Sequence, residues 1–254
     1  MCSLSWRRHG KRISLFFTRD ESVHRPLAEL PKLFVENGVR FLMPKDPQGA
    51  GSWLAVNEFG LVIALLNDYQ GQLKPITSSL RSRGLLVRAL ASCRSIDDAH
   101  SVLQAWPLAL SQPFQLALVI DQRAELWRYN GSQAQLESSK LPPHLFSSGH
   151  VNAAEIIEAR NRFVKTQVLD SDQALLALHR CHEPVVLNEL TEPDLAYSFC
   201  MHRDEARSQS LSQISLEQGV VRMRYWNGQP CLTDQFSEYL LKRTEVGGDI
   251  ADIQ

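Results

Sequence analysis

The stretch MCSLSWRRHGKRISLFFTRD, residues 1–20, decides how the rest of the chain is interpreted. Apolar and polar residues alternate on both sides of a short polar link that contains His9 and Gly10. Alternation with a period of two predicts β-strands, and glycine in a tight link accommodates a positive φ. The stretch therefore predicts a β-hairpin whose first strand begins at Cys2.

A turn centred on His9 and Gly10 sets the expected register of this hairpin. Three pairs then share one face: Trp6 with Ile13, Leu4 with Leu15, and Cys2 with Phe17. Arg19 follows on the same face, beside the open end of the strand that carries Cys2. A guanidinium there would favour a thiolate and could bind a carbonyl or carboxylate of a substrate.

Cys2 is the residue with the most distinctive chemistry in this stretch. Removal of Met1 by an aminopeptidase would leave a thiol and a free α-amine on one residue, which is a nucleophile with its own base. These groups titrate near ~8.5 and ~8, so local fields decide their state at neutral pH. Position alone favours the simpler interpretation, in which Cys2 is an arbitrary small residue beside the initiator.

The basic residues before Asp20 are also typical of a mitochondrial presequence, but strand-like alternation argues against the amphipathic helix that a presequence requires. The whole chain of 254 residues has 27 basic and 28 acidic side chains, which does not indicate a nucleic-acid partner. Five cysteines without a close pair favour a reduced compartment, and we expect a cytoplasmic protein. No apolar run approaches the roughly 20 residues of a membrane span.

The rest of the chain predicts an α+β fold in a single domain, residues 1–254, with helices around two sheets. Strands are expected over 52–56, 61–66, 114–120, 125–129, 197–201, 208–216 and 220–226, and helices over 85–93, 96–105, 152–168 and 171–181. Ser95 is expected to cap the second helix, Cys93 to be buried, and Arg160 and Arg162 to be surface charges. Residues from 247 onward are expected to fray.

Several ordered motifs resemble one family. Cys2, Thr18-Arg19-Asp20-Glu21 and Arg25-Pro26 are similar to the signature of the NRDE, or transport and Golgi organisation protein 2, family, which reads Asn-Arg-Asp-Glu followed by Arg-Pro. Thr18 departs from the family asparagine. The segments 49–57 and 60–67, and Arg83-Gly84, also have family counterparts. The resemblance extends over residues 2 to about 90.

This family is considered related to the N-terminal-nucleophile hydrolases, among them penicillin V acylase and bile salt hydrolase. The resemblance implies a four-layer αββα sandwich of two mainly antiparallel sheets. It implies that Cys2 is the nucleophile, that Arg19 and Asp20 orient nucleophile and substrate, and that Asn67 helps form an oxyanion hole. Whether Asp20 or Glu21 supports Arg19 stays open.

Three further residues are candidates for substrate binding: Trp53, Ser148 and His150. Ser148 is nearest to the position of a second oxyanion-hole asparagine in the related acylases, and His150 is alternatively a solvated loop residue. His179, Cys181 and His182 match no compact zinc spacing, so we expect no metal and no cofactor. His202-Arg203-Asp204 could border the pocket or form a solvent-facing ion pair.

The resulting hypothesis is an N-terminal cysteine amidohydrolase or acyltransferase that acts on the amide or thioester bond of a small acyl substrate. The alternative is a non-catalytic carrier that holds haem or a lipid in the same pocket, because members of the family have been linked to such ligands. A third possibility is a structural or partner-binding protein on an old fold. The oligomeric state is not predicted.

Overall fold

The computed structural model describes residues 2–77, 79–185 and 194–244. Two antiparallel sheets form the centre of the molecule. The first sheet has six strands, whose spatial order is β10 (His144–Ser147), β1 (Cys2–His9), β2 (Arg12–Ser22), β11 (Ala206–Glu217), β12 (Val220–Asn227) and β13 (Ser237–Lys242). The long β1–β2 hairpin, predicted from alternation, therefore lies inside this sheet with a neighbour on each side.

The second sheet has seven strands in sequential order. They are β3 (Glu29–Glu36), β4 (Val39–Lys45), β5 (Leu54–Asn57), β6 (Val62–Asn67), β7 (Phe114–Ile120), β8 (Arg123–Tyr129) and β9 (Ala134–Ser138). The β5–β6 pair confirms the two predicted apolar strands joined by a tight turn. Asn57 closes that turn, since its Oδ1 accepts from the backbone N–H groups of Phe59 and Leu61.

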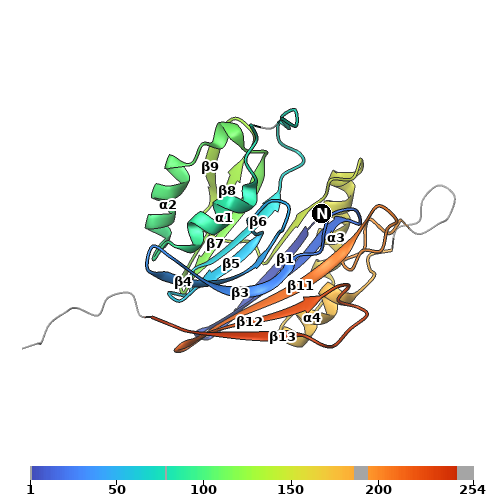
Figure 1. Ribbon diagram of the computed structural model, residues 1–254. Helices are drawn as coiled ribbons and strands as arrows, with labels where there is room; N and C mark the ends of the chain where they lie inside the picture. Colours follow the sequence, from blue (N-terminus) through green and yellow to red (C-terminus); the bar gives the residue numbers. More distant parts are fainter. Residues whose placement is uncertain (1, 78, 186–193, 245–254) are drawn as a thin grey trace, which may run out of the picture.

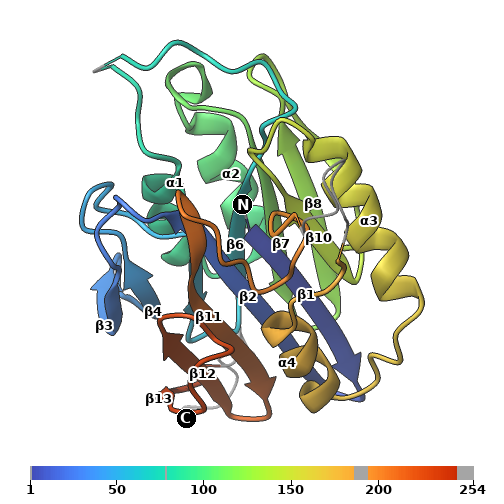
Figure 2. The ribbon, with the colours of Figure 1, turned by 90° about the vertical axis from the view of Figure 1, so that its right-hand side faces the viewer.

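Helices cover the outer face of each sheet, as Figures 1 and 2 show. Helices α1 (Arg83–Ala91) and α2 (Ile96–Ala105) pack on the seven-stranded sheet, and α3 (Ala153–Lys165) and α4 (Asp172–Arg180) pack on the six-stranded sheet. A short 3-10 turn, Leu108–Leu110, follows α2. Ser95 caps α2 in a capping box with Asp98, as predicted. The four-layer αββα arrangement is therefore confirmed.

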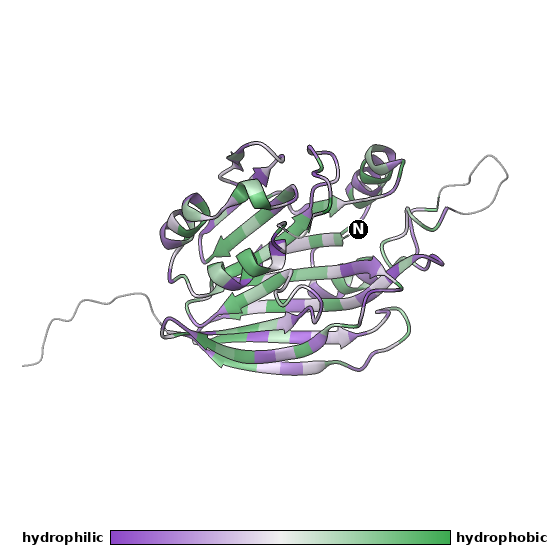
Figure 3. Cartoon of the chain, turned by 45° about the horizontal axis from the view of Figure 1, so that its top comes forward, coloured by the Kyte–Doolittle hydropathy of each residue, from purple (hydrophilic) through white to green (hydrophobic). Residues whose placement is uncertain are grey.

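The main core lies between the two sheets. Strands of both sheets contribute apolar side chains there, and the hydropathy colouring of Figure 3 shows hydrophobic residues along the central strands and hydrophilic ones in the loops. Two further clusters fill the spaces between each sheet and its helices. Cys93 is buried in the cluster beneath α1 and α2, as expected. No helix in the described part of the chain is long and apolar enough to cross a membrane.

The hairpin register differs from the predicted one by a shift of two residues in the pairing. Gly10, at φ 59°, and Lys11 form the turn, and the pairs are Trp6 with Leu15, Leu4 with Phe17, and Cys2 with Arg19. The predicted turn placed glycine second, whereas the left-handed residue comes first in this turn. A shift of two preserves the face, so the predicted grouping of Cys2, Phe17 and Arg19 on one side of the sheet holds.

Two other expectations are wrong. Residues 197–201 form bends and irregular loop rather than a strand, although they are buried and mostly apolar. Arg160 is not a surface charge but fully buried, because its guanidinium donates to the carbonyls of Ala196 and Ser198 and to Ser3 Oγ. Arg162 is exposed, as expected. The expected fraying from residue 247 lies outside the described residues.

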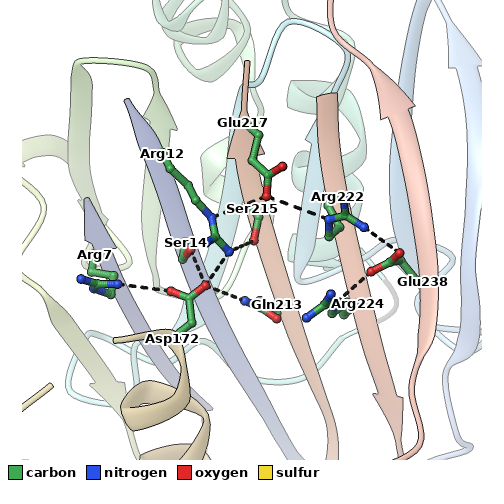
Figure 4. A network of polar contacts seen from close by, with 10 residues as sticks. All are labelled: Arg7, Arg12, Ser14, Asp172, Gln213, Ser215, Glu217, Arg222, Arg224 and Glu238. Carbon is green, nitrogen blue, oxygen red and sulfur yellow. Dashed lines mark hydrogen bonds and ion pairs between the residues drawn. The ribbon is translucent and has the colours of Figure 1, made fainter. Parts of the chain in front are cut away.

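A polar network fixes α4 on the outer face of the six-stranded sheet, as Figure 4 shows. Asp172, the first residue of α4, accepts from Arg12 Nη2 at 2.6 Å and from Ser14 Oγ at 3.0 Å. Gln213 Nε2 adds a third donor at 3.2 Å. The carboxylate also lies at the helix N-terminus, where negative charge is favourable. These contacts secure the helix that packs behind β2.

Candidate active site around Cys2

Cys2 lies where strands and loops of both sheets surround a cavity of about 520 Å³. It begins β1 near the point marked N in Figure 1, between Arg19 of β2 and Ser147 of β10. The predicted residues Arg19, Asp20, Trp53 and Asn67 line the same cavity. The fold therefore places these four residues, the last of them far from Cys2 in the sequence, around one cavity with the candidate nucleophile.

Arg19 is held by three neighbours and is only 4% exposed. Its Nη1 donates to Gln209 Oε1 at 2.7 Å, and its Nη2 lies 3.3 Å from Glu21 Oε2. The guanidinium carbon lies 4.5 Å from the ring centre of Trp53, which is a cation–π contact. Glu21 rather than Asp20 is therefore the carboxylate that supports Arg19, which resolves the alternative left open by the sequence.

Gln209 reaches Arg19 because of an irregularity in β11. The pairing of β11 with β2 shifts between Ser208 and Ser210, so Gln209 is an extra residue in the ladder. Such a bulge turns a side chain that would otherwise keep the strand's alternation. The Gln209 amide is fixed at its other end, since its Nε2 donates to the Ser22 carbonyl at 2.9 Å.

Strand alternation places Thr18 and Asp20 on the face of β2 opposite Arg19, although Asp20, near the open end of the strand, also borders the cavity. Thr18 Oγ1 lies 2.7 Å from Nδ1 of the buried His179 in α4, so position 18 packs against the helix layer instead of the cavity. The residue that departs from the family asparagine is therefore not one that lines the cavity. Asp20 is buried and accepts from Ser208 Oγ at 2.6 Å. Burial raises the pKa of Asp20, while nearby Arg160 opposes this effect.

Burial also raises the pKa of the Cys2 thiol above its ordinary value. The negative charge of Asp20 acts in the same direction, and a hydrogen bond from the Asp20 backbone acts against it. At neutral pH the thiol form is consequently favoured unless positive charge is placed beside the sulfur. An α-ammonium group on Cys2 itself would lower the pKa of the thiol and so oppose the effect of burial.

Asn67 ends β6 and lies at the cavity with Tyr69. Its Nδ2 donates to Tyr69 Oη at 2.9 Å. The Tyr69 ring packs closely on Gly149, where an added Cβ would lie 3.0 Å from ring carbons. Burial raises the pKa of Tyr69, so its hydroxyl keeps its proton at neutral pH. Two hydrogen-bond donors are thus available on this side of Cys2.

The opposite wall depends on a close approach between two glycines. A Cβ on Gly51 would lie 2.1 Å from the backbone carbon of Gly84, and the Ser52 N–H donates to the Gly84 carbonyl at 3.1 Å. This contact seats the start of α1 against the segment before Trp53. Arg83, which precedes Gly84, lines the cavity and donates to the Pro113 carbonyl at 2.8 Å.

Ser148 and His150 are not among the residues that line the cavity. Ser148 is buried and its Oγ accepts from the His150 backbone N–H at 3.2 Å. Its neighbour Ser147 is the residue of β10 that pairs with Cys2. The predicted substrate-binding role of this pair therefore has less geometric support than that of Trp53.

Sequence reasoning missed three residues of the site, Tyr69, Arg83 and Gln209, and left open whether Asp20 or Glu21 is the partner of Arg19. A signal existed for Glu21, because strand alternation places it on the Arg19 face. Tyr69 lies in the turn after β6, which ends at Asn67, so strand alternation gives no signal for it. Gln209 has no local signal, since a bulge displaces it.

The fold and the position of Cys2 at the start of a central hairpin define the class: the chain has the fold of the N-terminal-nucleophile hydrolases. Within that class, the chain belongs to the Transport and Golgi organisation 2 family, whose sequence profile matches residues 1–225. The comparison with curated protein sequences gave no match.

Three solved structures illustrate the likeness. Penicillin V acylase from Agrobacterium tumefaciens is 9% identical, with 95% of this chain and 86% of that chain covered and a TM-score of 0.57. A mutant conjugated bile acid hydrolase from Clostridium perfringens is 13% identical, with coverages of 99% and 100% and a TM-score of 0.50. A Caenorhabditis elegans ortholog of N-acylethanolamine-hydrolyzing acid amidase is 11% identical, with coverages of 92% and 94% and a TM-score of 0.50. At these identities the likeness concerns the fold.

Proposed function

We propose that this protein is an N-terminal cysteine amidohydrolase or acyltransferase, with Cys2 as nucleophile after removal of Met1. The observation that carries the proposal is the pairing of Cys2 with a buried, fixed Arg19 at the cavity. A guanidinium held by Gln209, Glu21 and Trp53 loses little rotamer freedom when it binds a substrate. Such preorganisation is characteristic of sites that bind a reacting group.

The proposed reaction begins when the α-amine of Cys2 takes the thiol proton and the sulfur attacks the acyl carbonyl carbon. The carbonyl electrons move to oxygen, and the resulting oxyanion accepts hydrogen bonds. The Asn67 amide nitrogen has two hydrogens and donates one to Tyr69, so the second can serve the oxyanion. The amine then passes its proton to the leaving nitrogen as the C–N bond breaks, which leaves a thioester on sulfur.

Water or an acceptor amine completes the cycle. It attacks the thioester carbonyl and loses a proton to the α-amine, and the S–C bond breaks to release the acid or the new amide. The thiol is restored by that proton. A thioester substrate follows the same steps with a thiol as the leaving group.

The charges of the cavity support a substrate with an anionic group. Arg25 is paired with Asp46 at 2.5 Å, and Arg19 with Glu21. Arg81 and Arg83 line the cavity and form no ion pair with a carboxylate in the described part of the chain. A carboxylate or similar group on the acyl or leaving part of the substrate would therefore find cationic partners.

The carrier hypothesis is less well supported by this lining. A pocket for haem or a lipid is mainly apolar. Here arginines, carboxylates, serines and amides make up much of the wall, and Ile76 and Leu80 are among its few aliphatic side chains. We therefore favour catalysis on a polar acyl compound over storage of an apolar ligand.

The test is a panel of N-acyl amino acids, neutral N-acyl amides and acyl thioesters, assayed with wild type, Cys2→Ser and Cys2→Ala after intact mass confirms the loss of Met1. Wild type should release the acid, and Cys2→Ala should lose roughly 10³-fold or more in rate. Cys181→Ser, which changes a thiol outside the cavity, should retain full rate. Retention of Met1 in most of the protein, or equal rates in wild type and Cys2→Ala, would sink the proposal.

A matched substrate pair tests the anionic preference. N-acylglycine and N-acylglycinamide differ only in the carboxylate, and wild type should favour the former. Arg83→Gln should reduce this preference by about 10-fold, which is the loss of one charge-assisted hydrogen bond. Arg88→Gln is the control on the same helix, because Arg88 pairs with Glu36 away from the cavity. An unchanged preference in Arg83→Gln contradicts the assignment.

A further inference from the structure

Two cysteines and two histidines converge at a place outside the cavity that contains Cys2. The ligand atoms of His182, Cys200, His202 and Cys231 all lie within 4.8 Å of one another. His202 Nε2 is 3.1 Å from Cys231 Sγ and 3.5 Å from Cys200 Sγ. The rings of His182 and His202 meet edge to face, with centres 4.9 Å apart.

The two distances from His202 Nε2 to the sulfurs are close to the edges of a tetrahedral zinc site, and all four ligand atoms are near enough to converge on one ion. Zinc binds sulfur at about 2.3 Å and imidazole nitrogen at about 2.0–2.1 Å, so tetrahedral ligands lie roughly 3.3–3.8 Å from each other. His202 Nε2 lies close to this spacing from both sulfurs. Two thiolates also balance the two charges of the ion, which matters in a site where Cys200 is buried and Cys231 half-buried.

The four side chains come from three separate segments. His182 follows α4, Cys200 and His202 belong to the segment before β11, and Cys231 lies in the loop between β12 and β13. Sequence spacing cannot reveal such a set, which explains why the sequence predicted no metal. His182 is exposed, so an ion can enter from solvent.

From this convergence we propose that His182, Cys200, His202 and Cys231 form a structural Zn²⁺ site, independent of the function proposed for Cys2. Four protein ligands with no open position are typical of structural rather than catalytic zinc. A disulfide between Cys200 and Cys231 would explain why the two sulfurs are close. It would not explain why a nitrogen of each histidine also lies beside them, whereas a shared metal ion explains all four positions. Soft thiolates with imidazoles favour zinc over magnesium or calcium.

The ion would stabilise the segment that supports Asp20. Met201, between the two ligands of this segment, accepts from the Ser208 N–H and donates its own N–H to Ser208 Oγ, both at 2.9 Å. Ser208 Oγ in turn donates to Asp20 Oδ1. Arg160 holds the preceding residues through the carbonyls of Ala196 and Ser198. Metal binding is therefore expected to raise the unfolding temperature of the whole chain.

The experiment measures metal content in the full chain, purified without a polyhistidine tag and dialysed against Zn²⁺ and then against buffer. Mass spectrometry of the elements should find about one zinc per chain. Replacement by Co²⁺ should give thiolate-to-cobalt charge-transfer absorption, which reports sulfur ligands directly. Cys200→Ser and Cys231→Ser should each lose the stoichiometric zinc and this absorption.

Cys181→Ser is the matched control, because Cys181 is adjacent to His182 but outside the cluster, and it should keep its zinc. If the cysteine variants do not fold, titration of wild type with a thiol-specific mercurial should release zinc in step with modification of two thiols. Cys2→Ala should retain zinc whether or not it is active, which separates this proposal from the catalytic one. The proposal of a zinc site would be overturned by substoichiometric zinc in wild type, by a Cys200–Cys231 disulfide, or by a loss of zinc in Cys181→Ser equal to that in the two cluster variants.

Discussion

At the scale of single residues, the site depends on how accurately Arg19 is placed. Gln209 is the contact with the shortest hydrogen bond to the guanidinium, and its position depends on the bulge in β11. Gln209→Ala should therefore lower kcat/KM for the acyl substrate by roughly 10-fold or more, because small misplacements of a positioning group are costly. A pH profile unchanged in shape would show that the proton-transferring groups are intact.

Gln213→Ala is the control for this prediction. Gln213 lies on the same strand but donates to Asp172 on the outer face of the sheet. Gln213→Ala should lower the unfolding temperature, because this hydrogen bond is lost, and should leave kcat/KM near the wild-type value. Equal loss of activity in both variants would mean that a general weakening of β11, and not the position of Arg19, is responsible.

The second prediction at this scale concerns the reactivity of Cys2. Because burial raises the pKa of this thiol, the thiolate fraction near pH 7 is small. An α-ammonium created by removal of Met1 favours the thiolate. Processed protein should react with limiting iodoacetamide faster than protein that retains Met1, and the rate should rise with pH, by up to about 10-fold per unit below the thiol pKa.

Cys93 is the internal reference for these rates. Burial raises its pKa to about 11, so its labelling should be slow in both forms of the protein. Mass spectrometry of labelled peptides assigns each rate to its cysteine. Equal rates for Cys2 in the processed and unprocessed protein would contradict an activating role for the amine.

At the scale of elements, the meeting of α1 with the segment before β5 shapes the wall of the cavity. A Cβ on Gly51 would overlap the backbone at Gly84, and neither backbone can move without displacing Trp53 or Arg83. Gly51→Ala should reduce the free energy of unfolding by about 1–3 kcal/mol or more, measured by urea denaturation. Ala50→Gly is the matched change next door and should not destabilise, because Ala50 already has φ 56°. Similar losses in both variants would refute this explanation.

The sequence predicted those elements that are buried on a regular face. Strands β5 and β6 are apolar up to the asparagine that ends each of them, and these patterns identified the two strands. The alternation of the hairpin placed Cys2 near Arg19. Five strands were not predicted: β3, β4, β9, β10 and β13. Four of them are edge strands, which leave a weak pattern when they are short or bury few side chains. The inner strand β4 is largely buried and was missed although its residues 41–43 are apolar. A local pattern also gives no information about contacts between distant segments. Arg160 was therefore assigned to the surface, although it is buried against Ser3 and Ser198.

At the scale of the molecule, the two faces of the six-stranded sheet have different roles: one borders the cavity and the other packs against the helices. Its inner face carries Cys2 and Arg19 toward the cavity, and its outer face carries Ser3 and Thr18 toward the helices. Buried polar contacts from α3 and α4 therefore fix the strands that hold the proposed nucleophile. The helix layer thus influences the site without touching a substrate.

His179 makes this support dependent on pH. It is fully buried in α4, stacks on Phe16, and burial lowers its pKa to about 3. In the unfolded chain a histidine titrates near ~6.5, so between these values the unfolded state binds the proton and the folded state does not. Stability from neutral His179 is thus complete above about pH 6.5 and falls as the pH decreases toward 3.

The expected decrease in the free energy of unfolding approaches about 1.4 kcal/mol per pH unit in the lower part of this range. Urea denaturation at pH 7, 6 and 5 should show it in wild type. His179→Leu combined with Thr18→Val removes both partners of the hydrogen bond, and should give a smaller decrease over the same pH range. His9→Gln, at an exposed position, should keep the wild-type dependence. If the double variant loses stability with pH as steeply as wild type, other buried groups govern the acid sensitivity of the helix layer.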